Sequence, residues 1–413
     1  MSEPATESAS TVREVAAAAG AAERFREPTA DQVAGRGTVT PQQSGYQRYM
    51  AQQGIPVYEG PGFHDVRDLA LGRWARRDAA GAFLVLDQLA HFLGLFVLSV
   101  PAGGSTAPER HLYEERYWVV EGEGTTEVWA PAGPVHRFEW HAGSLFSIPL
   151  NMNYRIVNGG SSPVLLLSGN YAPRVMDIFE DLDFIFGSDH VFRERYDGGR
   201  DYFEPHLETL ATPEAGRALW RTSVIPDMVN CDLPLDNIRT PGYRRIELKM
   251  SNGNFWGFIG EHPAGRYSRA HYHPSGAGLV CVKGKGFTYA WPKSLGMTPW
   301  ADGHGDQVER VDYVPGGVVA AAPGKGDWFH QHFSTGKEPL RLLMFYGGQP
   351  GGPYFKYEGR HGQKVIGGTV TKGGNQIPYE LEDPYIRAEY RRMLALEGVE
   401  FDMPEGVDVP DAG

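Results

Sequence analysis

The sequence GRYSRAHYH at residues 265–273 and the sequence WFHQH at residues 328–332 organise the chain. Each is a strand-like run that places two histidines two residues apart. Because side chains alternate faces along a strand, the two histidines of each run are expected on one face. If the two runs face each other inside a barrel, three or four imidazoles converge on one point.

Converging neutral imidazoles suit a first-row transition metal such as Fe, Cu, Ni or Zn. The two runs therefore predict a metal site made by His271, His273 and His330. The alternative is a set of buried histidines satisfied by hydrogen bonds. The role of His332 stays open between a fourth ligand, a proton-shuttling residue and a surface residue.

The composition is that of an ordinary globular protein of 413 residues with a formal net charge of -12. This charge argues against nucleic acid or an anionic membrane as main partner, because both need a basic face. The two cysteines, Cys231 and Cys281, give no disulfide framework, which fits a reducing compartment. The N-terminus lacks a secretory pattern, and the longest apolar run, residues 89–100, is too short to span a bilayer. We therefore expect a cytoplasmic protein.

Changes in composition and in the pattern of apolar residues divide the chain into five segments. They are an N-terminal arm that is partly helical (1–57), a first strand-rich domain (58–172), a helical linker (173–242), a second strand-rich domain (243–350) and a C-terminal tail with a helix (351–413). Composition and apolar spacing predict helices at residues 11–25, 41–53, 175–186, 213–220 and 384–396. Short apolar runs between turn signals predict strands at residues 83–86, 93–100, 116–120, 125–129, 144–148, 164–168, 245–250, 255–259, 279–283, 286–290, 318–321 and 340–346.

The two strand-rich domains repeat each other. The tripeptide PAG begins at Pro101 and again at Pro263, which lies 162 residues later. The same offset relates two further pairs, His111 with His273 and Gly122 with Gly284. A repeat of this length indicates a duplicated domain rather than a solenoid unit.

The repeated frame resembles the cupin superfamily, and specifically a bicupin. The first motif of that family reads G, five residues, H-x-H, three or four residues, E, six residues, G. The first domain keeps this spacing in Gly103, Glu109-x-His111, Glu115 and Gly122. Glu109 stands where the first histidine of the family belongs.

The second cupin motif reads G, five residues, P-x-G, two residues, H, three residues, N. The first domain matches it with Gly143, Pro149, Tyr154 and Asn158, so that a tyrosine replaces the histidine. The ligand positions of this domain are thus Glu109, His111, Glu115 and Tyr154. These residues could hold Mn or Fe, but we favour a polar cluster in a barrel that has lost its metal. The two carboxylates would repel each other unless a cation, Arg110 or Arg116 offsets their charge.

The second domain fits the first motif from Gly265 through His271-x-His273 to Gly284, with Ala277 where the glutamate ligand belongs. Its second motif is looser. His330 aligns with the family histidine and Ser334 with the asparagine, whereas the expected proline and glycine are Lys325 and Asp327.

A cupin site without the glutamate resembles the three-histidine iron dioxygenases of the gentisate and 1-hydroxy-2-naphthoate type. Their patterns look like H-x-H with no glutamate before G-x-G, and W-x-H-x-H before a glycine. The runs at 271–273 and 328–332, followed by Gly336, are similar. In that family the metal-bearing cupin is usually the N-terminal one, whereas here it is the C-terminal one.

The resemblance implies an all-β fold of two tandem antiparallel β-barrel (jelly-roll) domains, with helical N- and C-terminal segments. It implies Fe(II) as the first choice of metal, with Mn, Ni, Cu or Zn as alternatives. The activity that it implies is that of a non-heme iron ring-cleaving dioxygenase, an oxidoreductase that cleaves a carbon–carbon bond in a hydroxylated aromatic acid or an enolisable carbonyl compound. Such bicupins are usually oligomers, so we expect a homo-oligomer.

Three neutral imidazoles leave the charge of the ion uncompensated and leave positions open for an anionic, aromatic substrate and dioxygen. Arg269 shares the predicted face of His271 and His273 and is assigned to the substrate carboxylate or oxyanion. His332 is assigned to proton shuttling. Two other functions stay open, namely a metal-dependent isomerase, decarboxylase or lyase without oxygen chemistry, and a non-catalytic binding bicupin.

Overall fold

The computed structural model describes residues 43–211, 218–273, 276–322, 328–346 and 368–403. The described residues from Ser44 onward form one compact unit. Most of the predicted N-terminal arm, including the helix expected at residues 11–25, lies outside the described residues.

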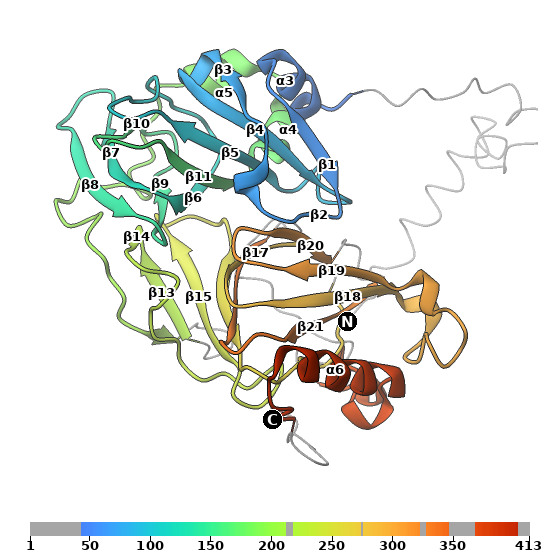
Figure 1. Ribbon diagram of the computed structural model, residues 1–413. Helices are drawn as coiled ribbons and strands as arrows, with labels where there is room; N and C mark the ends of the chain where they lie inside the picture. The colour runs from blue at the N-terminus through green and yellow to red at the C-terminus, as the bar shows by residue number, and fades with distance from the viewer. Residues whose placement is uncertain (1–42, 212–217, 274–275, 323–327, 347–367, 404–413) are drawn as a thin grey trace, which may run out of the picture. The chain divides into compact units, whose positions relative to one another are not determined.

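The first half of the described chain is built from two sheets (Figure 1). Its strands are β1 (Val57–Gly60), β2 (Gly62–Phe63), β3 (Gly72–Trp74), β4 (Ala79–Leu86), β5 (Gly94–Val100), β6 (Glu115–Glu121), β7 (Glu123–Trp129), β8 (His136–His141), β9 (Leu145–Ile148), β10 (Asn153–Val157) and β11 (Val164–Asn170). The larger sheet contains the order β1-β4-β5-β11-β6-β9, and the smaller sheet has the order β10-β7-β8.

The second half repeats this plan. Its strands are β12 (Leu210–Ala211), β13 (Ala218–Thr222), β14 (Val224–Ile225), β15 (Arg244–Met250), β16 (Gly257–His262), β17 (Ala277–Lys283), β18 (Gly286–Pro292), β19 (Glu309–Tyr313), β20 (Val318–Ala322), β21 (Trp328–Ser334) and β22 (Leu340–Tyr346). The larger sheet contains the order β13-β15-β16-β22-β17-β20, and the smaller sheet has the order β19-β18-β21.

The two halves exchange short strands at equivalent edges. Strand β14 follows the first half in sequence and pairs with β9 at the edge of the first large sheet. Strand β2 comes from the start of the first half and pairs with β20 at the matching edge of the second. The predicted fold class, two tandem jelly-roll domains in a mostly β chain, is confirmed. The sheets of each half stay separate among the described strands, so each domain is an open jelly roll rather than a closed barrel.

Two glycines of the sequence repeat form equivalent turns. Gly122 lies between β6 and β7, and Gly284 lies between β17 and β18. Their φ angles are 87° and 80°, a region that favours glycine. A Cβ atom would lie 2.6 Å from the Val164 side chain at the first turn, and 2.4 Å from the carbonyl oxygen of Pro339 at the second.

Four α-helices accompany the sheets of the described chain, namely α3 (Gly45–Gln53), α4 (Ala172–Phe179), α5 (Leu182–Gly187) and α6 (Pro384–Glu397). Helix α3 begins with a capping box made by Ser44 and Gln47. The predicted helix at residues 175–186 is divided between α4 and α5, and the predicted helix at 384–396 is α6. Among the described helices, none is long and apolar enough to cross a membrane.

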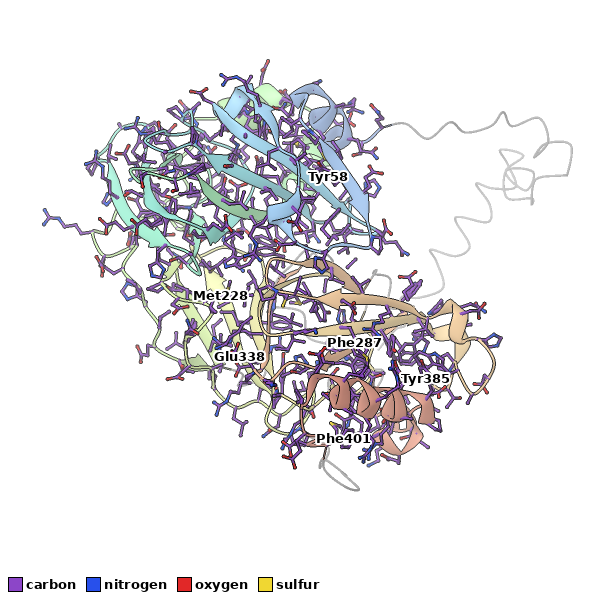
Figure 2. All side chains as sticks on the ribbon, viewed as in Figure 1. Tyr58, Met228, Phe287, Glu338, Tyr385 and Phe401 are labelled. Carbon is purple, nitrogen blue, oxygen red and sulfur yellow. The ribbon has the colours of Figure 1, made fainter. Side chains whose placement is uncertain are left out.

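Helix α6 covers the small sheet of the second domain. Its buried residues Ile386, Tyr390 and Leu394 pack in one cluster with Phe287 of β18 and Phe333 of β21. Figure 2 shows Phe287 on the sheet and Tyr385 and Phe401 around the helix. This layer supports the strand that carries His330.

The segment predicted as a helical linker also contains strands. Residues 212–217 of the helix expected at 213–220 lie outside the described residues. The remainder is the start of β13, which pairs in parallel with β15. The prediction of a helix is therefore wrong for residues 218–220, because their apolar side chains Leu219 and Trp220 are buried as part of the second large sheet.

Candidate metal centre

The second domain gathers three histidines into one group. The ligand atoms of His271, His273 and His330 all lie within 4.8 Å of one another, a spacing that could hold a metal ion. The ring centroids of His271 and His330 are 4.1 Å apart, and those of His273 and His330 are 4.8 Å apart. Within the described residues this is the only such group, and it contains no carboxylate.

Backbone pairing brings two of these histidines together. His330 lies on β21, and its N–H donates to the carbonyl oxygen of His271 at 2.9 Å. The N–H of His271 donates in return to the carbonyl oxygen of His330, also at 2.9 Å. Directly opposite residues of an antiparallel pair present their side chains on the same face, so the two imidazoles meet over one side of the ladder.

The hydrogen bonds of the rings fit a bound cation. Nδ1 of His271 lies 3.1 Å from the carbonyl oxygen of Arg269, so it carries the proton and donates it. The lone pair of Nε2 is therefore available to a metal. Nδ1 of His330 is buried and has no hydrogen-bond partner among the described residues. A nitrogen whose lone pair faces a cation would be in this state.

The environment keeps the imidazoles of His271 and His330 neutral. Burial lowers the pKa of His271 well below its usual range, and the positive charge of Arg239 and the neighbouring histidines lower it further. The pKa of His330 is lowered in the same way, first by burial and then by His273, His332 and Arg239. Neutral imidazole is the form that binds a metal, so the ligands need no deprotonation at neutral pH.

His332 lies beside the group rather than in it. Its ring centroid is 5.4 Å from that of His330 and 5.9 Å from that of His271. Its Nδ1 lies 3.0 Å from the hydroxyl of Tyr313. The ring centroid of His262, which the sequence analysis did not single out, lies 5.6 Å from that of His332, with the two rings tilted by 60°. Burial and the charge of Arg239 lower the pKa of His262 to about 3.

The structure places Arg269 against an aromatic ring. Its guanidinium lies 5.3 Å from the ring centroid of Tyr379, and its Nε has no hydrogen-bond partner among the described residues. The alternation that assigned Arg269 to the face of His271 assumed a regular strand. Tyr267 faces Phe333 and His271 faces His330, so the five residues 267–271 lie opposite the four residues 330–333. This irregularity breaks the simple alternation.

The arginine whose charge acts on the histidines is Arg239, which the sequence analysis missed. It contributes to the lowered pKa values of His262, His271, His330 and His332. Its carbonyl oxygen accepts the N–H of Arg269 at 3.0 Å. Arg239 lies 162 residues after Arg77, which is the offset of the domain repeat.

Arg77 fills the corresponding centre of the first domain. It is 1% exposed, and its guanidinium donates to the hydroxyls of Tyr154 at 2.7 Å and Tyr117 at 3.0 Å. The same group lies 3.8 Å from a carboxylate oxygen of Glu109 and 3.8 Å from one of Glu115. Arg76 adds a second cation, because its guanidinium donates to Glu109 at 3.1 Å. The charge that offsets the two carboxylates thus comes from Arg77 and Arg76, and not from Arg110 or Arg116 as the sequence suggested.

Glu115 is the most heavily bonded group of this cluster. It accepts hydrogen bonds from Tyr154 at 2.6 Å, Tyr117 at 2.8 Å and Ser168 at 2.8 Å. Its Oε2 also lies 3.2 Å from Nε2 of His111. Burial alone would raise the pKa of Glu115, but Arg77 and these hydrogen bonds outweigh it and lower the pKa to about 2. The cluster is an ionic network with its own internal cations, Arg77 and Arg76.

Comparisons with known proteins give structural likenesses only. No protein-family model and no curated protein matches the chain. Among solved structures, an oxalate decarboxylase formate complex from Lactobacillus farciminis has a TM-score of 0.44 at 13% identity and covers 70% of this chain and 86% of its own. A mutant of Bacillus subtilis oxalate decarboxylase has a TM-score of 0.44 at 11% identity, with coverage of 76% and 87%. A vicilin from Corylus avellana has a TM-score of 0.41 at 12% identity, with coverage of 70% and 85%.

These comparisons correct one prediction from the sequence. The structures named above are oxalate decarboxylases and a vicilin, not ring-cleaving dioxygenases. The prediction of a non-heme iron ring-cleaving dioxygenase is therefore wrong, and the preference for Fe(II) loses its basis. The prediction of a dioxygenase rested on short motifs. Three imidazoles without a carboxylate define a cation site, but they determine neither the metal nor the reaction.

Proposed function

We propose that the chain is a metal-dependent enzyme that breaks or rearranges a bond next to a carboxylate in a small anionic substrate, as a decarboxylase, lyase or isomerase, without consuming oxygen. The observation that carries the proposal is the group of three histidines with no carboxylate among them, of which His271 and His330 are buried and neutral, beside the positive charge of Arg239. His271, His273 and His330 would hold a divalent first-row cation such as Mn(II).

The charge of the site selects the substrate. Three neutral ligands leave both charges of a divalent cation uncompensated, and Arg239 adds a third positive charge nearby. An anion of low charge can therefore be held by the cation and by a guanidinium at once, and a carboxylate offers the oxygens for both. The bound cation would supply Lewis-acid stabilisation of negative charge that develops on a substrate oxygen.

The chain's own residues divide the remaining work. Arg239 orients the substrate carboxylate. Arg269, whose backbone N–H is bonded to the carbonyl oxygen of Arg239, adds a second guanidinium for the same carboxylate. Nδ1 of His332 is engaged with the hydroxyl of Tyr313, which leaves Nε2 of His332 to accept or deliver the proton that these reactions move. The burial of His332, which is 6% exposed, keeps bulk water away from that nitrogen.

The test is turnover with a measured oxygen balance. The purified chain is loaded with Mn(II) and offered a panel of small carboxylic acids, while product formation and oxygen uptake are followed together. We expect product without stoichiometric oxygen uptake, and we expect the Arg239→Met variant to raise KM for the anionic substrate. One oxygen molecule consumed per product would contradict the proposal.

A further inference from the structure

A segment from the C-terminal part of the chain lies directly beside the histidines. Gln376 forms an antiparallel bridge with His271. The N–H of Tyr272 donates to the carbonyl oxygen of Asn375 at 3.1 Å, and the N–H of Ile377 donates to the carbonyl oxygen of Ala270 at 2.8 Å. His271 is thus paired on both sides, with His330 of β21 on one side and with Gln376 on the other.

The two pairs differ in kind. His271 and His330 exchange both backbone hydrogen bonds, whereas His271 and Gln376 are bracketed by the bonds of their neighbours. The latter is the non-hydrogen-bonded pair, in which opposite Cα atoms are only about 4.5 Å apart and the side chains lie closer. Because opposite residues share a face, the side chains of Gln376, His271 and His330 form one row over the same side of the ladder.

The side chain of Gln376 is buried without a partner. The residue is 0% exposed, and neither its amide oxygen nor its amide nitrogen has a hydrogen-bond partner among the described residues. An unsatisfied buried polar atom costs about 1–3 kcal/mol. A primary amide left in this state is therefore expected to bind a ligand. The Oε1 of Gln331 also lacks a partner among the described residues, but its Nε2 donates to the carbonyl oxygen of Ser268 at 2.9 Å. Gln331 follows His330 directly on β21, so its side chain lies on the other face of that strand.

We infer that the amide oxygen of Gln376 is a fourth protein ligand of the cation, beside His271, His273 and His330. This inference rests on the metal site of the proposed function. In the cupin frame a glutamate supplies the oxygen ligand from the position that Ala277 occupies here. Gln376 would supply an oxygen from another segment and, being neutral, would leave the positive charge of the site available to the substrate.

The chemistry of the donor set has a consequence for metal choice. Imidazole nitrogens suit Zn, Cu, Fe and Ni, whereas carbonyl oxygens suit Mn and Mg. Three nitrogens and one amide oxygen therefore shift the preference of the site toward Mn(II). Loss of the oxygen should weaken Mn(II) binding more than Zn(II) binding.

The experiment measures metal binding directly, without turnover. Dissociation constants for Mn(II) and Zn(II) are compared among the wild type, Gln376→Met and the control Gln331→Met, together with the Mn(II) electron paramagnetic resonance spectrum. Gln331 is also fully buried and adjoins His330 in sequence, but its Nε2 is bonded to Ser268 and its side chain lies on the other face of β21. We expect Gln376→Met to weaken Mn(II) binding at least tenfold and to change the spectrum, and Gln331→Met to leave both unchanged in the folded protein.

A second variant keeps the inference testable if Gln376→Met fails to fold. Gln376→Glu retains an oxygen donor and adds a charge, so it should bind Mn(II) at least as tightly as the wild type. Unchanged Mn(II) binding and spectrum in Gln376→Met, a weakened Gln376→Glu, or a wild type that binds no divalent cation would each overturn the inference. Normal metal binding without turnover would instead count against the proposed function alone.

Discussion

The two domains share one framework, but their equivalent internal positions hold different chemical groups. In the first, Arg77 supplies a cation from within the chain, and Glu109 and Glu115 lie around it. In the second, the positions of the two glutamates are His271 and Ala277. The arginine at the matching position, Arg239, now adjoins neutral imidazoles.

The difference is that the cation of the first domain is a fixed side chain, whereas the cation of the second domain would be an exchangeable metal ion. Arg77, which is fixed by tyrosine hydroxyls, and Arg76 together balance the charges of Glu109 and Glu115, so this interior has no need for a further cation. Neutral imidazoles bring no charge of their own, so a metal and an anion must be taken from solution to complete that site. The comparison teaches that side-chain cations can occupy the interior of one jelly roll where the other offers a site for a metal.

The largest expected effect concerns Arg77. Replacing it by methionine would leave Glu115 without its cation and Glu109 with Arg76 alone, and breaking a buried pair from one side costs about 3–5 kcal/mol. We expect Arg77→Met to lower the free energy of unfolding by that amount in denaturant titrations. The matched variant Arg239→Met should cost less stability than Arg77→Met, because Arg239 is only partly buried and the neighbouring imidazoles are uncharged. Equal losses in both variants would break the comparison.

The next effect concerns metal content. We expect the wild type to bind one divalent ion per chain, and His271→Ala to lose about 3–4 kcal/mol of binding free energy, or roughly 10²–10³ in affinity. His111→Ala changes the equivalent cluster of the first domain and should leave metal content at one ion per chain. Elemental analysis and titration with Mn(II) measure both. Two ions per wild-type chain would show that the first domain also binds a metal.

Two buried carboxylates, one in each half, should respond to pH in opposite directions. The pKa of Glu115 is lowered to about 2 from its ordinary value of 4.5, so its contribution is present at neutral pH and is lost as pH falls through 4.5 toward 2. Burial raises the pKa of Glu382 to about 7, so its contribution is present below 4.5 and is lost as pH rises toward 7. Each shift corresponds to about 3 kcal/mol.

The measurement is the free energy of unfolding of the wild type and Glu382→Gln between pH 3 and pH 8. The wild type should lose stability toward both ends of this range. Glu382→Gln should remove the loss between about pH 5 and pH 7 and keep the loss on the acid side, because Glu115 is unchanged. A wild type whose stability rises from pH 5 to pH 7 would contradict the shift assigned to Glu382.

Much of the framework could be predicted because it is local or repeated. Turn glycines and alternating apolar runs indicate strands, and the 162-residue offset reveals the duplication that relates Gly122 to Gly284. The spacing of His271 and His273 indicates a site for the same reason, since two residues apart on an extended chain means one face. The trio with His330 followed from the cupin frame.

The remaining site residues could not be predicted, because tertiary structure alone brings them in. Arg77 and Arg239 precede their strands and carry no motif of their own. Gln376 lies 105 residues after His271 and reaches it through a single bridge. Arg269 was assigned by alternation, which the irregular pairing beside β21 breaks. Sequence spacing predicts faces only where the ladder is regular.

The smallest expected effect comes from making the second centre more like the first. Ala277 opens β17 as Glu115 opens β6, and its side chain is 3% exposed, so Ala277→Glu would place a carboxylate toward the interior of the second domain. A carboxylate there should attract the cation and compete with the anionic substrate. We expect metal affinity to rise and KM to rise about tenfold, which is about 1.4 kcal/mol. Ala277→Gln, of the same size without the charge, is the control, because steric crowding alone would affect both variants equally. If the two variants raise KM alike, size explains the effect, and the uncompensated charge of the second centre does not select its substrate.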